Sequence, residues 1–176
     1  MRALAIDPGS RNLGWSHMVD KKVVMVNTLK LPEVKKDING WADSRDMFLM
    51  LDYFMRMQMD SMMLQDGVGL VMPTYVIIET FFPQNFRGAT VVPEVRAVIK
   101  LNAYKVNIPI IEVSPSQVKK FITGIGNADK DLVRSHILEM YPNNTLVSGE
   151  LDDNAIDSIA IGLTGIEKIR KVNGSI

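Results

Sequence analysis

Five acidic residues stand where predicted strands end or a predicted helix begins. Asp7 ends a small, apolar run at residues 2–6, and Glu79 ends a β-branched run at residues 75–78. The other three open the last apolar segment of the chain: Asp152, Asp153 and Asp157. Carboxylates that converge from neighbouring elements cannot all stay ionised without compensating cations. We therefore interpret these acids as candidate metal ligands.

An oxygen-only cluster suits Mg²⁺ or Mn²⁺, and two such ions about 4 Å apart can activate water and stabilise the leaving oxygen in phosphodiester hydrolysis. The chain has no cysteine and two histidines, His17 and His136, so a zinc site is hard to build. Taken singly, each acid also has an ordinary role. Asp7 suits a turn, Glu79 suits a solvated strand end, and either Asp152 or Asp153 suits a helix N-cap.

Basic residues follow the acids at positions that fit phosphate binding. Lys119 and Lys120 lie on the helix after the fifth predicted strand. Lys130 and Arg134 lie one turn apart on the next helix and so share a face. Solvated helix charge is an equally good interpretation of all four residues.

Two aromatic residues, Phe81 and Phe82, follow Glu79 directly. An aromatic side chain in a loop beside a phosphodiester site can stack on an unpaired base. Core packing is the alternative for at least one of the two rings.

The elements that must position these residues form a mixed α/β domain. Strands at residues 2–6, 14–19 and 22–29 read as an antiparallel meander. The expected order then continues with a methionine-rich helix at 43–63, a strand at 75–78, a helix at 93–107, a strand at 108–113, a helix from 114 through 121, a helix at 128–141 capped by Asn127, and a helix from 152 past 169. This order predicts a five-stranded sheet, three antiparallel strands plus parallel ones, with helices on both faces. The first strand should lie beside the fourth, which would bring Asp7 next to Glu79.

Composition limits the class of protein. The 176 residues suit a single domain spanning 1–176, and a formal net charge of zero argues against nucleic-acid binding through overall positive potential. Local phosphate contacts remain compatible with that charge. The absence of cysteine and of an apolar run of ~20 residues predicts a cytoplasmic protein with no membrane span.

Four segments, in order, resemble the motifs of RuvC-type Holliday junction resolvases of the ribonuclease-H-like superfamily. Residues 5–15 (Ala-Ile-Asp-Pro-Gly-Ser-Arg-Asn-Leu-Gly-Trp) resemble the first motif, and residues 77–79 with Phe82 resemble the second. Residues 116–130 resemble the third, and residues 157–161 resemble the closing acidic helix. The resemblance runs from residue 3 to about residue 163, which makes it specific.

The resemblance implies a magnesium-dependent endonuclease with two Mg²⁺ ions per site, for which Mn²⁺ can substitute. Its substrate would be a four-way junction or other branched DNA. Lys119 and Lys130 carry over as phosphate-binding or catalytic lysines, and Phe82 as the aromatic that meets bases at the crossover. The family also implies a homodimer. The methionine-rich helix is a candidate interface, with core packing as the alternative.

The chain departs from the family pattern at its last pair of acids. Bacterial members usually place these acids three residues apart, but the residue three before Asp157 is Asn154. Asp153 shares the helical face of Asp157, whereas Asp152 is rotated from it by about 140°. We predict Asp153 as the fourth ligand and Asp152 as a cap, with Asn154 as an alternative oxygen donor. The departure suggests a divergent member of a phage or organelle lineage, and a phage protein would act in the host cytoplasm.

Other functions are compatible with such a fold. Actin-like and sugar-kinase-like phosphotransferases also begin with an Asp-x-Gly turn, but 176 residues leave no room for their duplicated domain. A non-catalytic nucleic-acid-binding module would gain nothing from keeping Asp7, Glu79 and Asp157 together. RuvX-like proteins share the Asp-Pro-Gly start and fit Phe82 and the lysines less well.

Overall fold

The computed structural model describes residues 1–36, 38–39, 42–60, 72–81, 91–148 and 150–174. Its main sheet has five strands in the order β3-β2-β1-β6-β7. The strand bounds are β1 Arg2–Asp7, β2 Asn12–Val19, β3 Lys22–Lys30, β6 Tyr75–Glu79 and β7 Ile110–Val113. The first three strands pair antiparallel, and β6 lies parallel to both β1 and β7. The predicted meander with added parallel strands is confirmed.

The pairing of β1 with β6 places two strand ends side by side. Ile6 lies opposite Ile78, so Asp7 and Glu79 each follow a paired position at the same edge of the sheet. Both strands are short runs of small or β-branched residues and are buried on both faces, as a central parallel strand requires. Because β1 and β6 are neighbouring parallel strands, Asp7 and Glu79 lie next to each other, as predicted.

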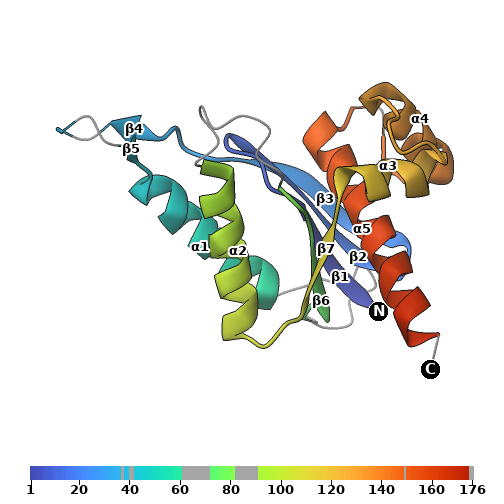
Figure 1. Cartoon of the computed structure of the whole chain (residues 1–176), viewed down its shortest axis with the longest axis horizontal. Coiled ribbons are helices and arrows are strands. Elements are labelled where there is room, and N and C mark those ends of the chain that lie inside the picture. Colours follow the sequence, from blue (N-terminus) through green and yellow to red (C-terminus); the bar gives the residue numbers. More distant parts are fainter. Residues whose placement is uncertain (37, 40–41, 61–71, 82–90, 149, 175–176) are drawn as a thin grey trace.

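Helices cover both faces of the sheet (Figure 1). On one face lie α1 (Arg45–Asp60) and α2 (Val91–Lys105), packed on Leu4, Ile6 and Ile78. On the other face lie α3 (Pro115–Thr123), α4 (Lys130–Met140) and α5 (Asp153–Asn173). The long helix α5 packs on Ala3, Ala5 and Ile77. This arrangement confirms the predicted α/β architecture.

Helix α1 has a buried side and an exposed apolar side. Met47, Met55 and Met59 are buried with Leu51 and Phe54 in the core. The opposite face presents Leu49 and Tyr53, which are 70% and 66% exposed, together with Met57. Core packing thus accounts for part of the methionine-rich segment, and an apolar surface remains.

Several sequence-based boundaries need correction. Asn127 does not cap α4. The N-cap is Asp129, whose side chain accepts a hydrogen bond from the Leu132 amide at 2.8 Å, because a turn between Ile125 and Ala128 delays the start of the helix. Helix α1 begins at Arg45 rather than at residue 43, and residues 61–63 of the predicted helix lie outside the described part. Helix α2 spans Val91–Lys105 rather than residues 93–107. Two short strands were not predicted: β4 Lys35–Lys36 and β5 Ala42–Asp43.

The N-cap of α3 agrees with its sequence signal. The Ser114 side chain accepts from the Gln117 amide, and the Gln117 side chain accepts from the Ser114 amide, which completes a capping box before Pro115. In the described part of the chain, no helix combines the length and apolar character needed to span a membrane.

Candidate active site

Three carboxylates and two lysines face one small cavity at the carboxyl ends of β1 and β6. We call it the acidic cavity. Its volume is about 290 Å³, and its polar lining consists of Asp7, Glu79, Asp157, Lys119 and Lys130. Its apolar walls are Pro115, Val118, Val133 and Ile161. The structure therefore brings together five of the predicted site residues, from β1, β6, α3, α4 and α5.

A tight turn after β1 directs Asp7 to the edge of the sheet. The Gly9 amide donates to the Asp7 carbonyl at 3.1 Å, so the chain turns within two residues. A Cβ at position 9 would lie 2.0 Å from the Asn12 carbonyl oxygen, a distance that only glycine avoids. The Asp-Pro-Gly sequence thus positions the first carboxylate.

Asp157 reaches the cavity because the start of α5 lies directly against β2. A Cβ at Gly14 would lie 1.8 Å from the Asn154 carbonyl oxygen, so the two backbones touch at this glycine. Asp152 caps the helix by accepting from the Ala155 amide at 2.9 Å, and its carboxylate also accepts from the Thr28 hydroxyl at 2.6 Å. These contacts fix the helix start, and Asp157 follows about one turn later.

The three carboxylates are partly buried and repel one another. Burial, followed by the charge of Asp157, raises the pKa of Asp7 to about 7. Burial, followed by the charges of Asp7 and Asp157, raises the pKa of Glu79 to about 7. Burial also raises the pKa of Asp157, although Lys130 opposes this change. Each of the three carboxylates therefore ionises less readily than it would in water.

Lys130 is the cation held closest to these acids. Its Nζ lies 3.1 Å from Asp157 Oδ2, and that carboxylate raises the pKa of Lys130. The lysine side chain is still 67% exposed. Lys130 therefore extends from the acids toward solvent.

The donor chemistry of the cavity fits divalent cations. All three acids supply oxygen ligands, and burial keeps their pKa values raised although the charge of Lys130 opposes this. Within the ranges that the structure describes, no three acidic or histidine side chains form a ready-made metal cluster.

The other predicted ligand, Asp153, does not line the acidic cavity. Its carboxylate is 63% exposed and pairs with Arg134 Nη1 at 3.3 Å. Its charge still raises the pKa of Asp157, as expected for residues on one helix face. Arg134 also donates to the Leu151 carbonyl at 2.8 Å, so it ties α4 to the start of α5. Metal binding by Asp153 and DNA contact by Arg134 stay predictions.

Of the remaining residues considered in the sequence, Lys119 lines the acidic cavity, whereas Lys120 lines a separate hollow between α3 and α5. Phe82 lies outside the described residues. His17 is buried and bonds Gln58, and His136 bonds the Leu132 carbonyl, so neither histidine faces the cavity.

Sequence reasoning missed one charged residue near the site. Arg96 on α2 is buried, donates to Glu112 Oε2 at 3.0 Å, and lowers the pKa of Glu79 through its charge. Within the described ranges, its Nη1 is buried and has no hydrogen-bond partner. The sequence could have indicated that Arg96 is buried, because Arg96 falls on the apolar helix face that includes Ile99.

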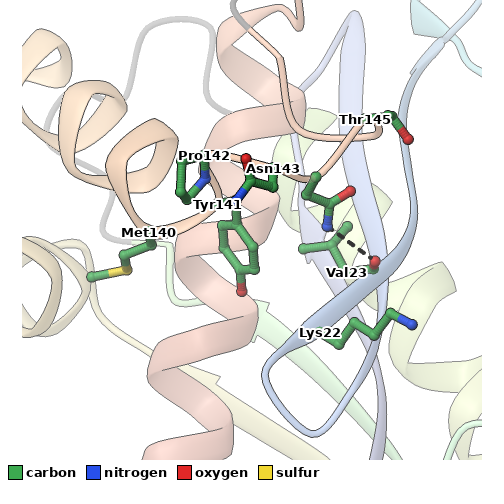
Figure 2. A pocket seen from close by; sticks show the side chains of 8 residues that line it. Lys22, Val23, Met140, Tyr141, Pro142, Asn143 and Thr145 are labelled. Carbon is green, nitrogen blue, oxygen red and sulfur yellow. Dashed lines mark hydrogen bonds between the residues drawn. The ribbon is translucent and has the colours of Figure 1, made fainter.

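A larger hollow at the end of α4 has a different character (Figure 2). It lies between Tyr141, Pro142 and Asn143 on one side and Lys22 and Val23 on the other, and no acidic residue lines it. It therefore lacks the chemistry of the acidic cavity.

Comparison with known proteins gives a consistent result. A family model described as Crossover junction endodeoxyribonuclease RuvC matches residues 3–165. The protein of that name from Synechococcus sp. (strain WH7803) is 31% identical over 174 residues, which cover 94% of this chain and 97% of the relative.

Two solved structures share the fold. The Thermus thermophilus RuvC structure has a TM-score of 0.71 at 18% identity and covers 99% of this chain and 97% of its own. T. thermophilus RuvC in complex with Holliday junction substrate has a TM-score of 0.68 at 20% identity. The match covers 98% of this chain and 96% of the other.

Proposed function

Because the chain belongs to the RuvC family of crossover junction endodeoxyribonucleases, we propose that its acidic cavity hydrolyses phosphodiester bonds where DNA strands cross. The chain is a DNA endonuclease, and the resemblance inferred from its motifs is confirmed. The observation that carries the assignment to this cavity is the convergence of Asp7, Glu79 and Asp157 with two lysines. The active unit is a single domain spanning 1–176 that acts in the cytoplasm, or in the host cytoplasm if a phage encodes it.

RuvC nucleases are metal-dependent, and the site takes two Mg²⁺ ions, with Mn²⁺ as a substitute. Asp7, Glu79 and Asp157 would hold them, and Asp153 would be the fourth ligand. When bound, the cations supply activation of water and stabilisation of the leaving oxygen. The apolar walls of the cavity limit bulk water around the scissile phosphate, which strengthens charge interactions there.

Lys119 and Lys130 position the phosphate. Both lysines line the same cavity as the acids, from α3 and α4. Lys130 can exchange its contact with Asp157 for a phosphate oxygen, since its side chain reaches the exposed side of the cavity. Phe82 meets unpaired bases at the crossover, and Lys120 and Arg134 complete the DNA-binding set.

The enzyme acts as a homodimer that presents two cavities to a four-way junction. Leu49, Tyr53 and Met57 on α1 support this proposal, because they lie four residues apart and form one exposed apolar stripe. Light scattering after gel filtration tests it. Tyr53→Lys should yield monomers with an unchanged circular dichroism spectrum, and a variant that stays dimeric would exclude α1 as the interface.

Two earlier alternatives are not favoured. The family match covers nearly the whole chain, and it names an endonuclease rather than a phosphotransferase. A purely DNA-binding role would leave three mutually repelling carboxylates in the cavity without any benefit.

Cleavage of defined substrates tests the function. Purified protein with Mg²⁺ should cut a labelled synthetic four-way junction in strands of like polarity, and should cut linear duplex of the same sequence far more slowly. A Y-junction measures how broadly branched DNA is accepted. Equal rates on junction and duplex would contradict structure selectivity, and ATP hydrolysis without DNA would point back to a phosphotransferase.

A further inference from the structure

A basic groove lies on the far side of α3 from the acidic cavity. Helix α3 contributes Gln117, Lys120 and Phe121 to its lining, and α5 contributes Thr164, Lys168 and Lys171. These residues recur at intervals of three and four, so each helix presents one face to the groove. The groove has a volume of about 440 Å³. A hollow of this size therefore lies between α3 and α5.

The basic groove carries more positive than negative charge, although the whole chain is neutral. Its acidic residue, Glu167, already pairs with Lys21 at 3.5 Å. Lys168 donates to the Glu112 carbonyl at 2.9 Å, a contact that uses one of its three donors and does not neutralise its charge. Helix α3 contains no acidic residue. Lys120, Lys168 and Lys171 thus outnumber the one acidic residue of the lining.

Helix α3 joins the basic groove to the acidic cavity. Val118 and Lys119 line the cavity, while Gln117 and Lys120 line the groove, so a single helix separates the two hollows. Asp157 and Lys168 lie 11 positions apart on α5, which corresponds to about 16 Å along the helix. At 3.4 Å per base pair, this equals about five base pairs of duplex.

We propose that the basic groove binds the phosphodiester backbone of the DNA arm that leads away from the cleaved bond. Charge complementarity and continuity with the cavity across α3 favour duplex DNA as the occupant. Phosphate contacts of this kind set the register of a duplex without reading its sequence. The groove therefore holds an arm about five base pairs from the crossover, while the cavity holds the scissile phosphate. This inference rests on the proposed function, because it assumes a DNA substrate.

Salt dependence of junction binding tests the proposal. Lys168→Gln combined with Lys171→Gln, measured in a Glu79→Gln background to prevent cleavage, should reduce the slope of log K against log salt by about 1 to 2. Lys35→Gln combined with Lys36→Gln removes the same charge from exposed residues of β4 and should leave the slope unchanged. Arginine at positions 168 and 171 should preserve it. Equal slopes for the groove variant and its parent would overturn the proposal.

Neutral phosphate linkages identify the contact directly. Methylphosphonates placed in successive three-nucleotide windows along each arm should weaken binding of the parent protein in a window about five base pairs from the crossover. The groove double variant should lose nothing further in that window, because the two changes remove one contact. Additive losses in every window would overturn the groove assignment even if the enzyme cuts junctions. Failure of the wild-type protein to cut junctions would instead overturn the proposed function.

Discussion

Lys130 and Asp157 form an ion pair of 3.1 Å between α4 and α5, and the same pair forms one wall of the acidic cavity. One turn further along α4, Arg134 pairs with Asp153 in the same manner. The two pairs form a ladder between the helices. Only the first pair lines the cavity with the acids of β1 and β6, so the two cations lie in different surroundings.

Lys130→Met should slow cleavage by about 100-fold at saturating junction, because it removes a cation from the site where phosphate charge develops. The free energy of unfolding should fall by less than about 1 kcal/mol, since the Lys130 side chain is 67% exposed. Single-turnover kinetics and urea unfolding measure the two effects. Arg134→Met is the matched variant and should show the larger stability loss and the smaller rate loss. The reverse pattern would assign the structural role to Lys130.

Asp7→Asn should stabilise the protein in EDTA at pH 8. The pKa of Asp7 is about 7 in the folded protein and about 4 in the unfolded chain, so the folded state binds more protons between these values. Wild-type stability should therefore decline as pH rises from about 4 to 7, and the variant should lack that decline. We expect the variant to gain about 3–8 °C in Tm at pH 8 and almost nothing near pH 4.

Magnesium should reverse this ranking. Bound cations would offset the repulsion in wild-type protein and raise its Tm, while Asp7→Asn should respond weakly. Calorimetry with EDTA and with Mg²⁺ makes the comparison. If Asp7→Asn is less stable than wild type in EDTA at pH 8, the ionised Asp7 carboxylate does not destabilise the folded protein, and the prediction is wrong.

Asp153→Asn should abolish cleavage as Asp157→Asn does, whereas Asp152→Asn should retain most of it. Asparagine caps a helix about as well as aspartate, so the cap at position 152 survives the change. Cleavage assays with matched circular dichroism separate these outcomes. If Asp153→Asn cuts normally, its carboxylate serves the pair with Arg134, and the fourth ligand must be sought elsewhere.

Gly14→Ala should disrupt the site through the backbone. The added Cβ would lie 1.8 Å from the Asn154 carbonyl oxygen, so α5 must move away from β2. We expect a loss of about 3 kcal/mol in the free energy of unfolding, together with loss of cleavage. Gly126→Ala is the control, since its nearest neighbour would lie at 3.8 Å. Equal stability of the two variants would show that α5 tolerates the displacement.

The parts of the site that come from strand order were predictable from sequence. Asp7 and Glu79 end two runs of apolar residues, and parallel pairing of those strands leaves few other positions for their side chains. The helix cap at Asp152 was predictable for a similar reason, because capping depends on residues close in sequence.

Features that depend on packing between distant segments were not predictable. The pairing of Asp153 with Arg134 needs the spacing of α4 and α5, and the separation of Lys119 from Lys120 needs the rotation of α3 about its axis. The charge of Arg96 lowers the pKa of Glu79 from α2, which covers the other face of the sheet from α3, α4 and α5. The cap at Asp129 instead of Asn127 depends on the length of the preceding turn, since either residue caps a helix well.

Glu79→Gln offers the most direct test, because the amide keeps the shape of the side chain and removes the charge that would hold a cation. In Mg²⁺, the variant should bind a four-way junction with wild-type affinity and cut it at least about 1000-fold more slowly. Its circular dichroism spectrum should match that of wild type. Cleavage at more than about a tenth of the wild-type rate would show that the cavity of Asp7, Glu79 and Asp157 is not the catalytic centre.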